Sequence, residues 1–377
     1  MFKGDPALSQ VAEANQKTAF SLYCAIAEQT GNLVIAPLPY SLAFALLLNG
    51  TDAPTQKEIR AFTHMGALGL AAVNEQMHAL QKALANLNKS SGEAFTLANS
   101  LWASLPLSFT KAFLDAGHRY YDTAIESVPR DTLPARVSKW SREKTHDLVD
   151  MQLDKTDFAL LSATYFKGKW RNPFDESKTQ QEDFHPELVP AHKVPMMTQH
   201  GEFSYFQGET FHAVSLEFTF ADMCFLLPKD GLLSKRKLAE VEQKVLKDGW
   251  IMTQPFAKLP GMVKIPRFKI TQDGDFAPVL RQLGVNRLFD SFDSLRPAVT
   301  HPDGAAASAV LQNSMISVDE KGAEAASVLA IPMRVGAAPG WKPPKPFEFV
   351  ADRPFCFWIT DKATSSILFM GRVADPV

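Results

Sequence analysis

The residues that could do chemistry on their own do not fall into the spacing of a known enzyme site. The nine histidines include no HExxH pair for zinc, and no GxSxG surrounds a serine. FKGKW (166–170) lacks the glycine spacing and the Ser/Thr of a phosphate-binding loop. Cys24, Cys224 and Cys356 each lie in an apolar run, which favours core packing over a reactive thiol or a disulfide. The sequence thus predicts no enzyme, no metal site and no cofactor.

One segment is unusual in a different way. Residues 319–340, DEKGAEAASVLAIPMRVGAAPG, begin with acidic residues, continue through small and apolar ones and end in a Gly/Pro-rich stretch. Alternate positions form a small apolar face: Ala323, Ala325, Ser327, Leu329, Ile331 and Met333. Glu324 points the other way, so the pattern is that of a strand with one buried face. The alternative is an ordinary alanine-rich surface loop.

The overall charge limits the classes of partner. The chain has 39 basic and 41 acidic residues, a net charge of -2 and a pI near 6.5. No strong field therefore favours nucleic acid or an anionic membrane. The N-terminus has no apolar stretch of signal-peptide length, and LAFALLL (42–48) is far shorter than the ~20 residues of a membrane span. We expect a soluble protein that is cytoplasmic, or secreted after removal of a leader.

The expected elements change character along the chain. The first 150 residues read mostly as helices, over 8–29 and 71–88, with Thr55 and Glu58 as a capping box that opens another helix. From about residue 157 period-two patterns indicate strands, such as 214–220 and the apolar run 223–227 before the turn PKDG. Helices early and strands late predict an α+β architecture.

Several segments in a fixed order resemble the serpin family, the serine protease inhibitor fold, from about residue 10 to 377. They are NLVIAP (32–37), VSKWSREKT (137–145), TYFKGKWRNPFD (164–175), FHPELVPAHKVPMM (184–197), VKIPRFKI (263–270), DEKGAEAAS (319–327) and ADRPFCFWITDKATSSILFMGRV (351–373). The resemblance implies one domain over 1–377, with three β-sheets, eight or nine helices and an exposed reactive-centre loop at about 320–346.

The implied function is suicide inhibition of a serine protease, with a cysteine protease as a second possible partner. The protease cleaves the loop and is held as a covalent acyl complex while the loop inserts into the central sheet as a new strand. The implied inhibitor is a monomer without nucleic-acid or membrane partners. The alternative is a non-inhibitory serpin with a chaperone, carrier or storage role, for which a bulky or charged hinge would be expected.

The resemblance assigns the hinge to the start of the loop. Its residues are Glu320, Gly322, Ala323, Glu324, Ala325, Ala326 and Ser327. Gly322 gives the backbone freedom to turn, and the small residues after it can pass between strands. Pro332, further along, lacks a backbone donor and would interrupt the inserted ladder.

The resemblance also assigns a region that controls opening of the sheet. Glu320 is expected to pair with Arg267, with Trp170 packed beneath the pair. At the usual central polar cluster this chain has Ala36, Pro39, Ser162 and Gln312. We therefore expect most of that cluster to be replaced and sheet opening to be controlled differently.

The scissile bond is placed by counting about seventeen residues from Glu320, which gives Gly336–Ala337. A loop one residue shorter makes Val335 the specificity residue, and both choices indicate an elastase-like target with a small primary pocket. Arg334 and Met333 are the trypsin-like and chymotrypsin-like alternatives. Counting back from Arg353 instead would move the bond to about 340–343.

Overall fold

The computed structural model describes residues 8–85, 94–145, 147, 149–153, 156–229, 238, 242–243, 245–322 and 345–376. Its architecture is α+β, as expected. The α-helices within these residues are α1 (Ser9–Ile26), α2 (Pro37–Leu47), α3 (Ala53–Phe62), α4 (Leu70–Ala85), α5 (Lys111–Tyr120), α6 (Leu133–Thr145), α8 (Ala277–Gln282) and α9 (Arg287–Asp290). The short 3-10 helices are η2 (Glu176–Lys178), η3 (Lys247–Thr253) and η4 (Phe292–Leu295).

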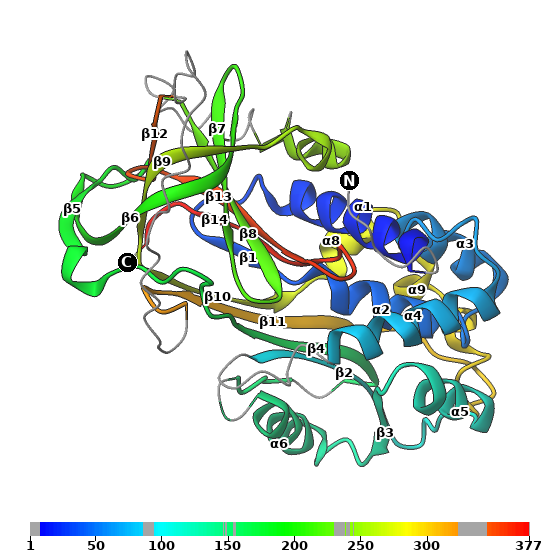
Figure 1. The fold of residues 1–377 in the computed structure, drawn as a ribbon. Coiled ribbons are helices and arrows are strands. Elements are labelled where there is room, and N and C mark those ends of the chain that lie inside the picture. Colours follow the sequence, from blue (N-terminus) through cyan, green and yellow to red (C-terminus); the bar gives the residue numbers. More distant parts are fainter. Residues whose placement is uncertain are drawn as a thin grey trace.

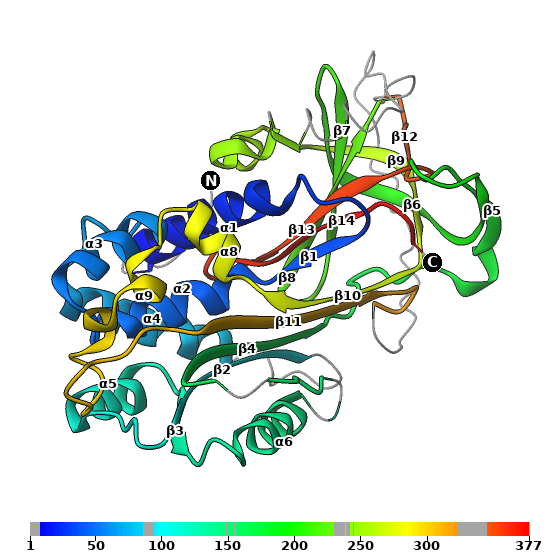
Figure 2. The ribbon, with the colours of Figure 1, turned by 180° about the vertical axis from the view of Figure 1, so that it is seen from behind.

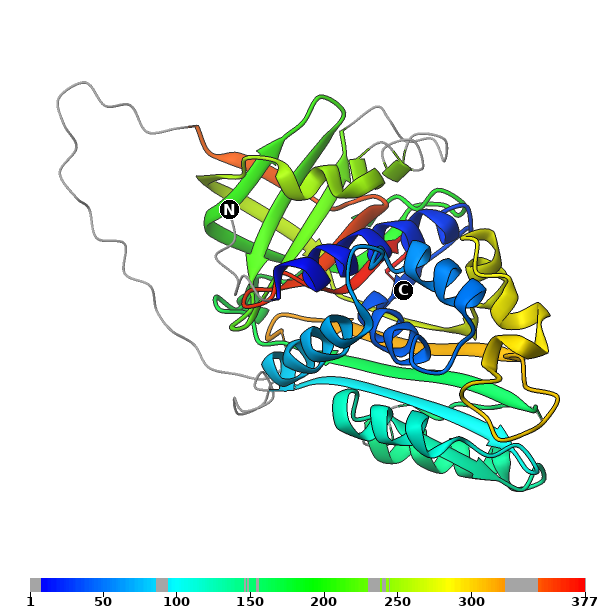
Figure 3. The same cartoon turned by 90° about the vertical axis from the view of Figure 1, so that its right-hand side faces the viewer.

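A five-stranded sheet forms the lower layer in Figure 1, in the order β10-β11-β4-β2-β3. Its strands are β2 (Ala94–Ser104), β3 (Ala124–Val128), β4 (Phe158–Lys167), β10 (Phe268–Asp275) and β11 (Ala309–Val318). Helix α6 lies below this sheet, and α2 and α4 lie above it (Figure 3). The sheet is therefore covered on both faces.

A second sheet has nine strands in the order β1-β14-β13-β8-β7-β6-β9-β12, with β5 paired to β6. Its strands are β1 (Leu33–Ile35), β5 (Gln180–Phe184), β6 (His192–Gln207), β7 (Phe211–Glu217), β8 (Ala221–Pro228), β9 (Ala257–Pro266), β12 (Phe347–Val350), β13 (Phe355–Asp361) and β14 (Ile367–Val373). The 16-residue β6 pairs with β5, β7 and β9 along its length and joins them into one ladder. Three sheets were expected. The described strands form two hydrogen-bonded sheets, because β6 joins the strands of two expected sheets into one.

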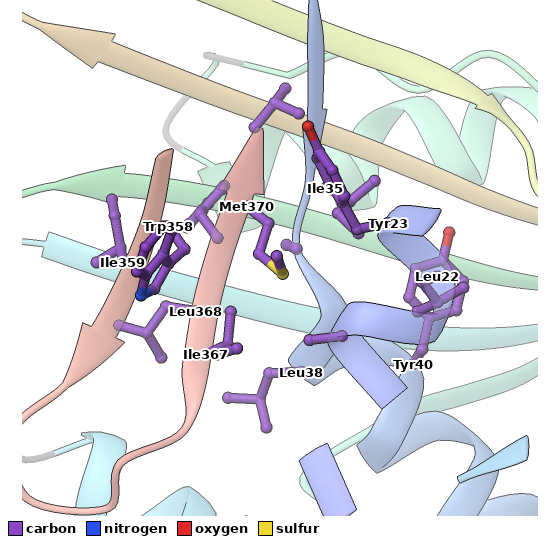
Figure 4. Close-up of a cluster of buried hydrophobic side chains, with 14 of the residues drawn as sticks. Leu22, Tyr23, Ile35, Leu38, Tyr40, Trp358, Ile359, Ile367, Leu368 and Met370 are labelled. Atoms are coloured by element: carbon purple, nitrogen blue, oxygen red, sulfur yellow. The ribbon is translucent and has the colours of Figure 1, made fainter. Parts of the chain in front are cut away.

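The core lies between the two sheets and the helices packed at one end. Figure 4 shows Tyr23, Leu38, Tyr40, Trp358 and Met370 meeting there from α1, α2, β13 and β14, and each is fully buried or nearly so. Seen from behind, α8 and α9 close the same end of the core (Figure 2). None of the helices in the described ranges is long and apolar enough to cross a bilayer.

The expected helices 8–29 and 71–88 correspond to α1 and α4, with 86–88 outside the described residues. The capping box at Thr55 and Glu58 is wrong. Asp52 caps α3 by accepting from the Thr55 amide at 2.9 Å, and Thr55 lies inside the helix. Glu58 instead accepts from the amides of Asn286 and Arg287 at 2.9 and 2.8 Å, next to the start of α9. The Glu58 side chain, which the local pattern assigned to a cap of α3, therefore makes a tertiary contact instead.

The expectation that the first 150 residues are mostly helical missed strands β2 and β3. In β2, Phe95 and Leu101 face the main core while Ala98 and Trp102 face the cluster between the sheet and α6. A strand that is buried on both faces loses the alternation of apolar and polar residues on which recognition depends. Of the expected strands after 157, β4 begins at Phe158 and the run 223–227 lies in β8, whereas the stretch 214–220 is strand only as far as Glu217, the end of β7.

The cysteines form no disulfide. Cys356 is buried, while Cys24 and Cys224 are half-buried, and Cys224 packs against the main core. Burial raises the pKa of the Cys224 thiol to about 12, so it remains protonated at neutral pH. The expected packing role is thus confirmed for Cys356 and Cys224, whereas Cys24 is half-buried and is not part of the core cluster.

Candidate functional site

The five-stranded sheet contains a seam at its centre, which we define as the junction between β4 and β11. These strands run parallel over the positions Ala309↔Ala159 to Ile316↔Phe166. Their outer neighbours, β10 and β2, are antiparallel to them. A chain that turned back after β11 would run antiparallel to both β11 and β4. Inserted at the seam, it would replace one parallel ladder by two antiparallel ones, and antiparallel pairing is the slightly more stable kind per residue.

The two faces of the seam meet different surroundings. Leu160, Val310 and Ile316 point into the main core, and Ala159, Ala163 and Leu161 point into the cluster between the sheet and α6. Helix α6 is held against the sheet by Trp140, whose ring centroid lies 6.4 Å from that of Trp102. Because α6 covers this face of the sheet (Figure 3), a strand entering the seam would pack one of its faces against the cluster between the sheet and α6.

The carboxyl end of β11 is tied down at Glu320, two residues after the strand ends. The Glu320 side chain is buried, and its two oxygens lie 2.8 and 2.7 Å from Nε of Arg267. A second Arg267 nitrogen lies 2.6 Å from the same carboxylate. The hydroxyl of Thr179 donates to it as well. The contact expected between Glu320 and Arg267 is therefore present.

The ionisation of Glu320 follows from these contacts. Burial by itself would raise its pKa, but the hydrogen bonds from Arg267 and Thr179 outweigh burial and hold the pKa below its ordinary value. The bond to Glu320 in turn raises the pKa of Arg267. The pair is thus fully charged at neutral pH.

Trp170 packs beside the same turn. Its indole Nε1 donates to the carbonyl oxygen of Asp319 at 2.8 Å, and its ring stacks on Phe218 at 4.0 Å between centroids. The amide of Phe174 donates to the carbonyl oxygen of Glu320 at 2.9 Å. Together these bonds fix the backbone at the first two residues of the segment 319–340.

Gly322 closes the turn with a backbone that only glycine adopts easily. Its φ is +74°, and an added Cβ would lie 2.6 Å from the carbonyl oxygen of Gly168 and closer still to the Trp170 amide. Both conformation and space therefore require glycine at this position. Gly322 thus adopts a left-handed conformation packed against the turn around Trp170, and its expected role as a hinge stays a prediction.

A row of polar side chains crosses the middle of the sheet at one register level. Gln312 of β11 is the partner of Ser162 in β4, and Ser162 is the partner of Asn99 in β2. The Ser162 hydroxyl donates to Asn99 Oδ1 at 2.7 Å. All three side chains are buried.

The polar row is anchored to the first turn of α2. Gln312 Nε2 donates to the carbonyl oxygen of Ala36 at 2.7 Å, and Asn99 Nδ2 donates to that of Pro39 at 3.0 Å. The Ala36 amide donates back to Gln312 Oε1 at 3.4 Å. The row therefore holds β11 and the β4–β2 pair to the same helix, on either side of the seam.

Comparison with known proteins identifies the family of this chain. The model of the family described as Serpin (serine protease inhibitor) matches residues 13–376. The chain belongs to the serpin family.

Known relatives match over most of the length of this serpin. It is 32% identical to alpha-1-antitrypsin of Sus scrofa, over 95% of this chain and 85% of the relative. It is 28% identical to Serpin B3 of Homo sapiens, over 98% and 100%. It is 27% identical to the protein Z-dependent protease inhibitor of Homo sapiens, over 97% and 83%. Inhibitors of proteases thus occur among its relatives.

Solved structures agree with the fold. AtSerpin1 of Arabidopsis, in its native stressed conformation, superposes with a TM-score of 0.85 at 23% identity, covering 98% of each chain. Serpin48 of Tenebrio molitor gives 0.82 at 24% identity, over 97% of this chain and 98% of that one.

The predicted site residues of this serpin fall into two groups. Arg267, Trp170 and Glu320 meet at the turn after β11, while Ser162 and Gln312 meet near Ala36 and Pro39 at the seam. The remaining hinge residues and the candidate scissile residues, 323–327 and 333–337, lie outside the described residues, as does Pro332.

The expectation that the central polar cluster is mostly replaced needs correction. Asn99 was not foreseen, and with Ser162 and Gln312 it makes a hydrogen-bonded cluster in which Ala36 and Pro39 contribute backbone carbonyls. The sequence did contain a clue to Asn99, which stands among small and apolar residues in ANSLWAS (98–104). It could not be used because no strand was expected there.

Proposed function

We propose that this serpin is a suicide-substrate inhibitor of a serine protease, of elastase-like preference, that acts by inserting its cleaved loop at the seam. The observation that carries the proposal is the placement of the seam. The parallel strands β4 and β11 lie side by side, and β11 leads directly through Gly322 into the small, alternating segment from Ala323. A strand that returns along β11 finds donors and acceptors on both sides.

The chemical step belongs to the protease. The oxygen of its catalytic serine adds to the carbonyl carbon of Gly336, or of Val335 in the shorter loop. The peptide bond to the next residue breaks, and the serine proton ends on the new amino group. An ester then joins the two proteins, and hydrolysis by water would release the protease. Insertion has to displace the protease before that hydrolysis.

The segment is long enough for this displacement. Gly322 to Gly336 spans 14 residue steps, which at about 3.4 Å each is roughly 48 Å of strand. A compact domain of this size has a diameter of roughly 55 Å. The inserted strand adds on the order of ten ladder hydrogen bonds at about 1 kcal/mol each, besides apolar burial. Insertion would thus carry the attached protease across the molecule and lower the free energy substantially.

Pro332 is compatible with insertion at this seam. If residues 319–322 form the turn, Ala323 stands opposite Val318 and each later residue stands opposite the preceding one in β11. Pro332 then stands opposite Ala309, which is at the end of the β11–β4 register farthest from the turn. The missing donor would cost one ladder bond at the far end, where insertion is already nearly complete.

The polar row supplies the barrier to opening in the uncleaved protein. Separating β11 from β4 requires Gln312 to leave Ala36, or Asn99 to leave Pro39, because both bonds end on α2. Each bond is buried, so breaking it without a replacement costs about 1–3 kcal/mol. The row thus resists spontaneous opening before a protease has cut the loop.

A panel of proteases tests the proposal. Each protease is incubated with the protein and the mixture is run on a denaturing gel, with an elastase, a trypsin, a chymotrypsin and a cysteine protease included. We expect a denaturant-resistant 1:1 adduct with the elastase, and mass spectrometry should locate the cut after Gly336 or Val335. Cleavage of the loop by every protease without an adduct would refute inhibition and favour the non-inhibitory alternative. An adduct cut after Arg334 would keep inhibition and correct the target.

A further inference from the structure

A cavity of about 470 Å³ lies between the tip of the β6–β7 hairpin and η3. Its aromatic lining residues are Phe206 and Phe211 from the hairpin and Trp250 from η3. The loop at the upper end of β7 lies at the top of Figure 1, whereas β4 lies in the lower sheet. The cavity is therefore separate from the seam, and the proposed inhibition makes no use of it.

The hairpin side of the cavity is held by a tight turn. The Gly208 amide donates to the carbonyl oxygen of Phe211 at 3.0 Å, and a Cβ on Gly208 would lie 2.6 Å from the Phe211 ring. Phe211 is thus packed against the turn and is buried, whereas Phe206 is half-buried. The positions of both rings follow from the hairpin itself.

Trp250 is presented from the opposite side. The residue before it, Gly249, has φ +71°, and a Cβ there would lie 2.9 Å from the ring of Phe20 in α1. Ile251, the residue after it, is fully buried, but Trp250 is 44% exposed. A large aromatic ring between two anchored residues, with nearly half of its surface open, is available to a ligand.

The three rings form a nearly equilateral arrangement. The centroid distances are 5.8 Å for Phe206–Phe211, 6.4 Å for Phe206–Trp250 and 6.3 Å for Phe211–Trp250. The indole plane makes angles of 74° and 78° with the two phenylalanine planes, and these two planes are tilted by 40° to each other, so the three rings face in three directions. A cation seated against the three rings can lie within about 6 Å of every centroid, the range of a cation–π interaction.

Charge selects the kind of ligand. Among the described residues that line the cavity, Glu209 is the charged one, and it is exposed at the hairpin tip. A carboxylate beside three aromatic rings attracts a cation and repels an anion. A primary ammonium would lose hydrogen bonds to water in so aromatic a lining, whereas a quaternary ammonium has no N–H group to satisfy.

We propose that this cavity binds a small soluble quaternary ammonium compound, with its trimethylammonium group against Phe206, Phe211 and Trp250 and Glu209 as the counter-charge. The volume is within the range of small-molecule pockets and exceeds what a trimethylammonium group alone needs. The rest of the ligand therefore extends along the hairpin tip past Gln207.

Calorimetric titration with choline tests the site, using 3,3-dimethyl-1-butanol as the neutral compound of the same shape. We expect choline to bind about tenfold more tightly, because the apolar contacts are equal and only the charge differs. Trp250→Ala should weaken choline binding about tenfold, and Trp250→Phe should retain most of it. Glu209→Gln should weaken choline binding two- to fivefold, roughly the value of one exposed charge contact. Phe292→Ala, which removes an exposed ring elsewhere (68% exposed), is the control and should change nothing.

Several outcomes would overturn the proposal. Equal affinities for choline and the neutral alcohol would make the cavity merely apolar, and choline binding unchanged by Trp250→Ala would place it elsewhere. Absence of saturable binding would show that there is no site. Flotation with phosphatidylcholine vesicles separates a free ligand from a lipid headgroup. We expect no co-flotation, because the headgroup phosphate would lie near Glu209 and be repelled by it. Co-flotation that choline abolishes would show that the site binds a lipid headgroup and not a soluble ligand.

Discussion

Gln312 and Ser162 are register partners across the seam, yet they bind different groups: Gln312 binds the backbone of Ala36, and Ser162 binds Asn99. The side chains at the centre of the sheet therefore connect its two halves through α2. Parting β4 from β11 therefore breaks a buried bond to the start of α2, Gln312 to Ala36 or Asn99 to Pro39, and not a side-chain bond across the seam itself.

Removing the Gln312 contact should loosen the native sheet. In Gln312→Leu the Ala36 carbonyl loses its donor in a buried position, and we expect the free energy of unfolding to fall by about 1–3 kcal/mol. Urea denaturation measures this change. Gln181→Leu, at an exposed position of the edge strand β5, is the control and should stay within about 0.5 kcal/mol of the parent. Equal effects of the two substitutions would show that the polar row does not stabilise the seam.

The Glu320–Arg267 pair should make stability depend on pH. The pKa of Glu320 is lower in the folded protein than its unfolded value of about 4.3, so its stabilising contribution is complete above that value and is lost as pH falls through the folded pKa. Compared with Glu320→Gln, the parent should be about 1–2 kcal/mol more stable at pH 7, discounted for the half-exposed Arg267. The difference should shrink below about pH 4. Unfolding curves at pH 7, 5, 4 and 3 measure it, and a constant difference would contradict the role of the carboxylate charge.

Gly322→Ala should destabilise the protein more than a glycine replacement at a similar φ elsewhere. Gly284 has φ +91° with nothing near its missing Cβ, whereas Gly322 at +74° faces Gly168 and Trp170. We expect about 1–2 kcal/mol for Gly284→Ala from backbone strain alone. Gly322→Ala should cost at least about 1 kcal/mol more because of the added clash. Thermal melting of both variants makes the comparison, and equal losses would show that the turn around Trp170 yields.

Ala323→Arg should convert the proposed inhibitor into a substrate. Inhibition requires insertion to outrun hydrolysis of the ester, and each ~1.4 kcal/mol added to the insertion barrier shifts that partition tenfold towards hydrolysis. A guanidinium forced between packed strands costs at least that much. The measurement is the number of inhibitor molecules consumed per protease molecule trapped. Ala338→Arg, on the far side of the expected bond, is the control, since that residue does not enter the sheet; a similar ratio for both variants would argue against hinge insertion.

Cutting the loop should stabilise the protein, the opposite of what a nick usually does. Once free at residue 336, the segment from Ala323 can fill the seam and gain the ladder bonds and burial estimated above. With about 1 kcal/mol worth roughly 2 °C at this size, the unfolding midpoint should rise by tens of degrees. Calorimetry of intact and cleaved protein side by side measures the shift. An equal or lower midpoint after cleavage would mean that the protein has the fold but does not insert its loop.

Short, specific motifs were sufficient to predict the family and one of the contacts at the turn after β11. The order of segments from NLVIAP to the carboxyl terminus led to the serpin fold, and the expected contact of Glu320 with Arg267 is present. Gly322 was also identifiable, because a glycine between an acidic turn and a run of small residues is typical of a backbone position that has to turn sharply.

Which side chains share a register level could not be predicted from local patterns, because it depends on how the strands pair. Asn99, Ser162 and Gln312 are far apart in the sequence, and only the pairing of β2, β4 and β11 brings them into one row. The use of Glu58 next to α9 instead of at a local cap was likewise a matter of packing. Local patterns report the period of one element, but the partners of a polar side chain are fixed when elements meet and every buried donor has to find an acceptor.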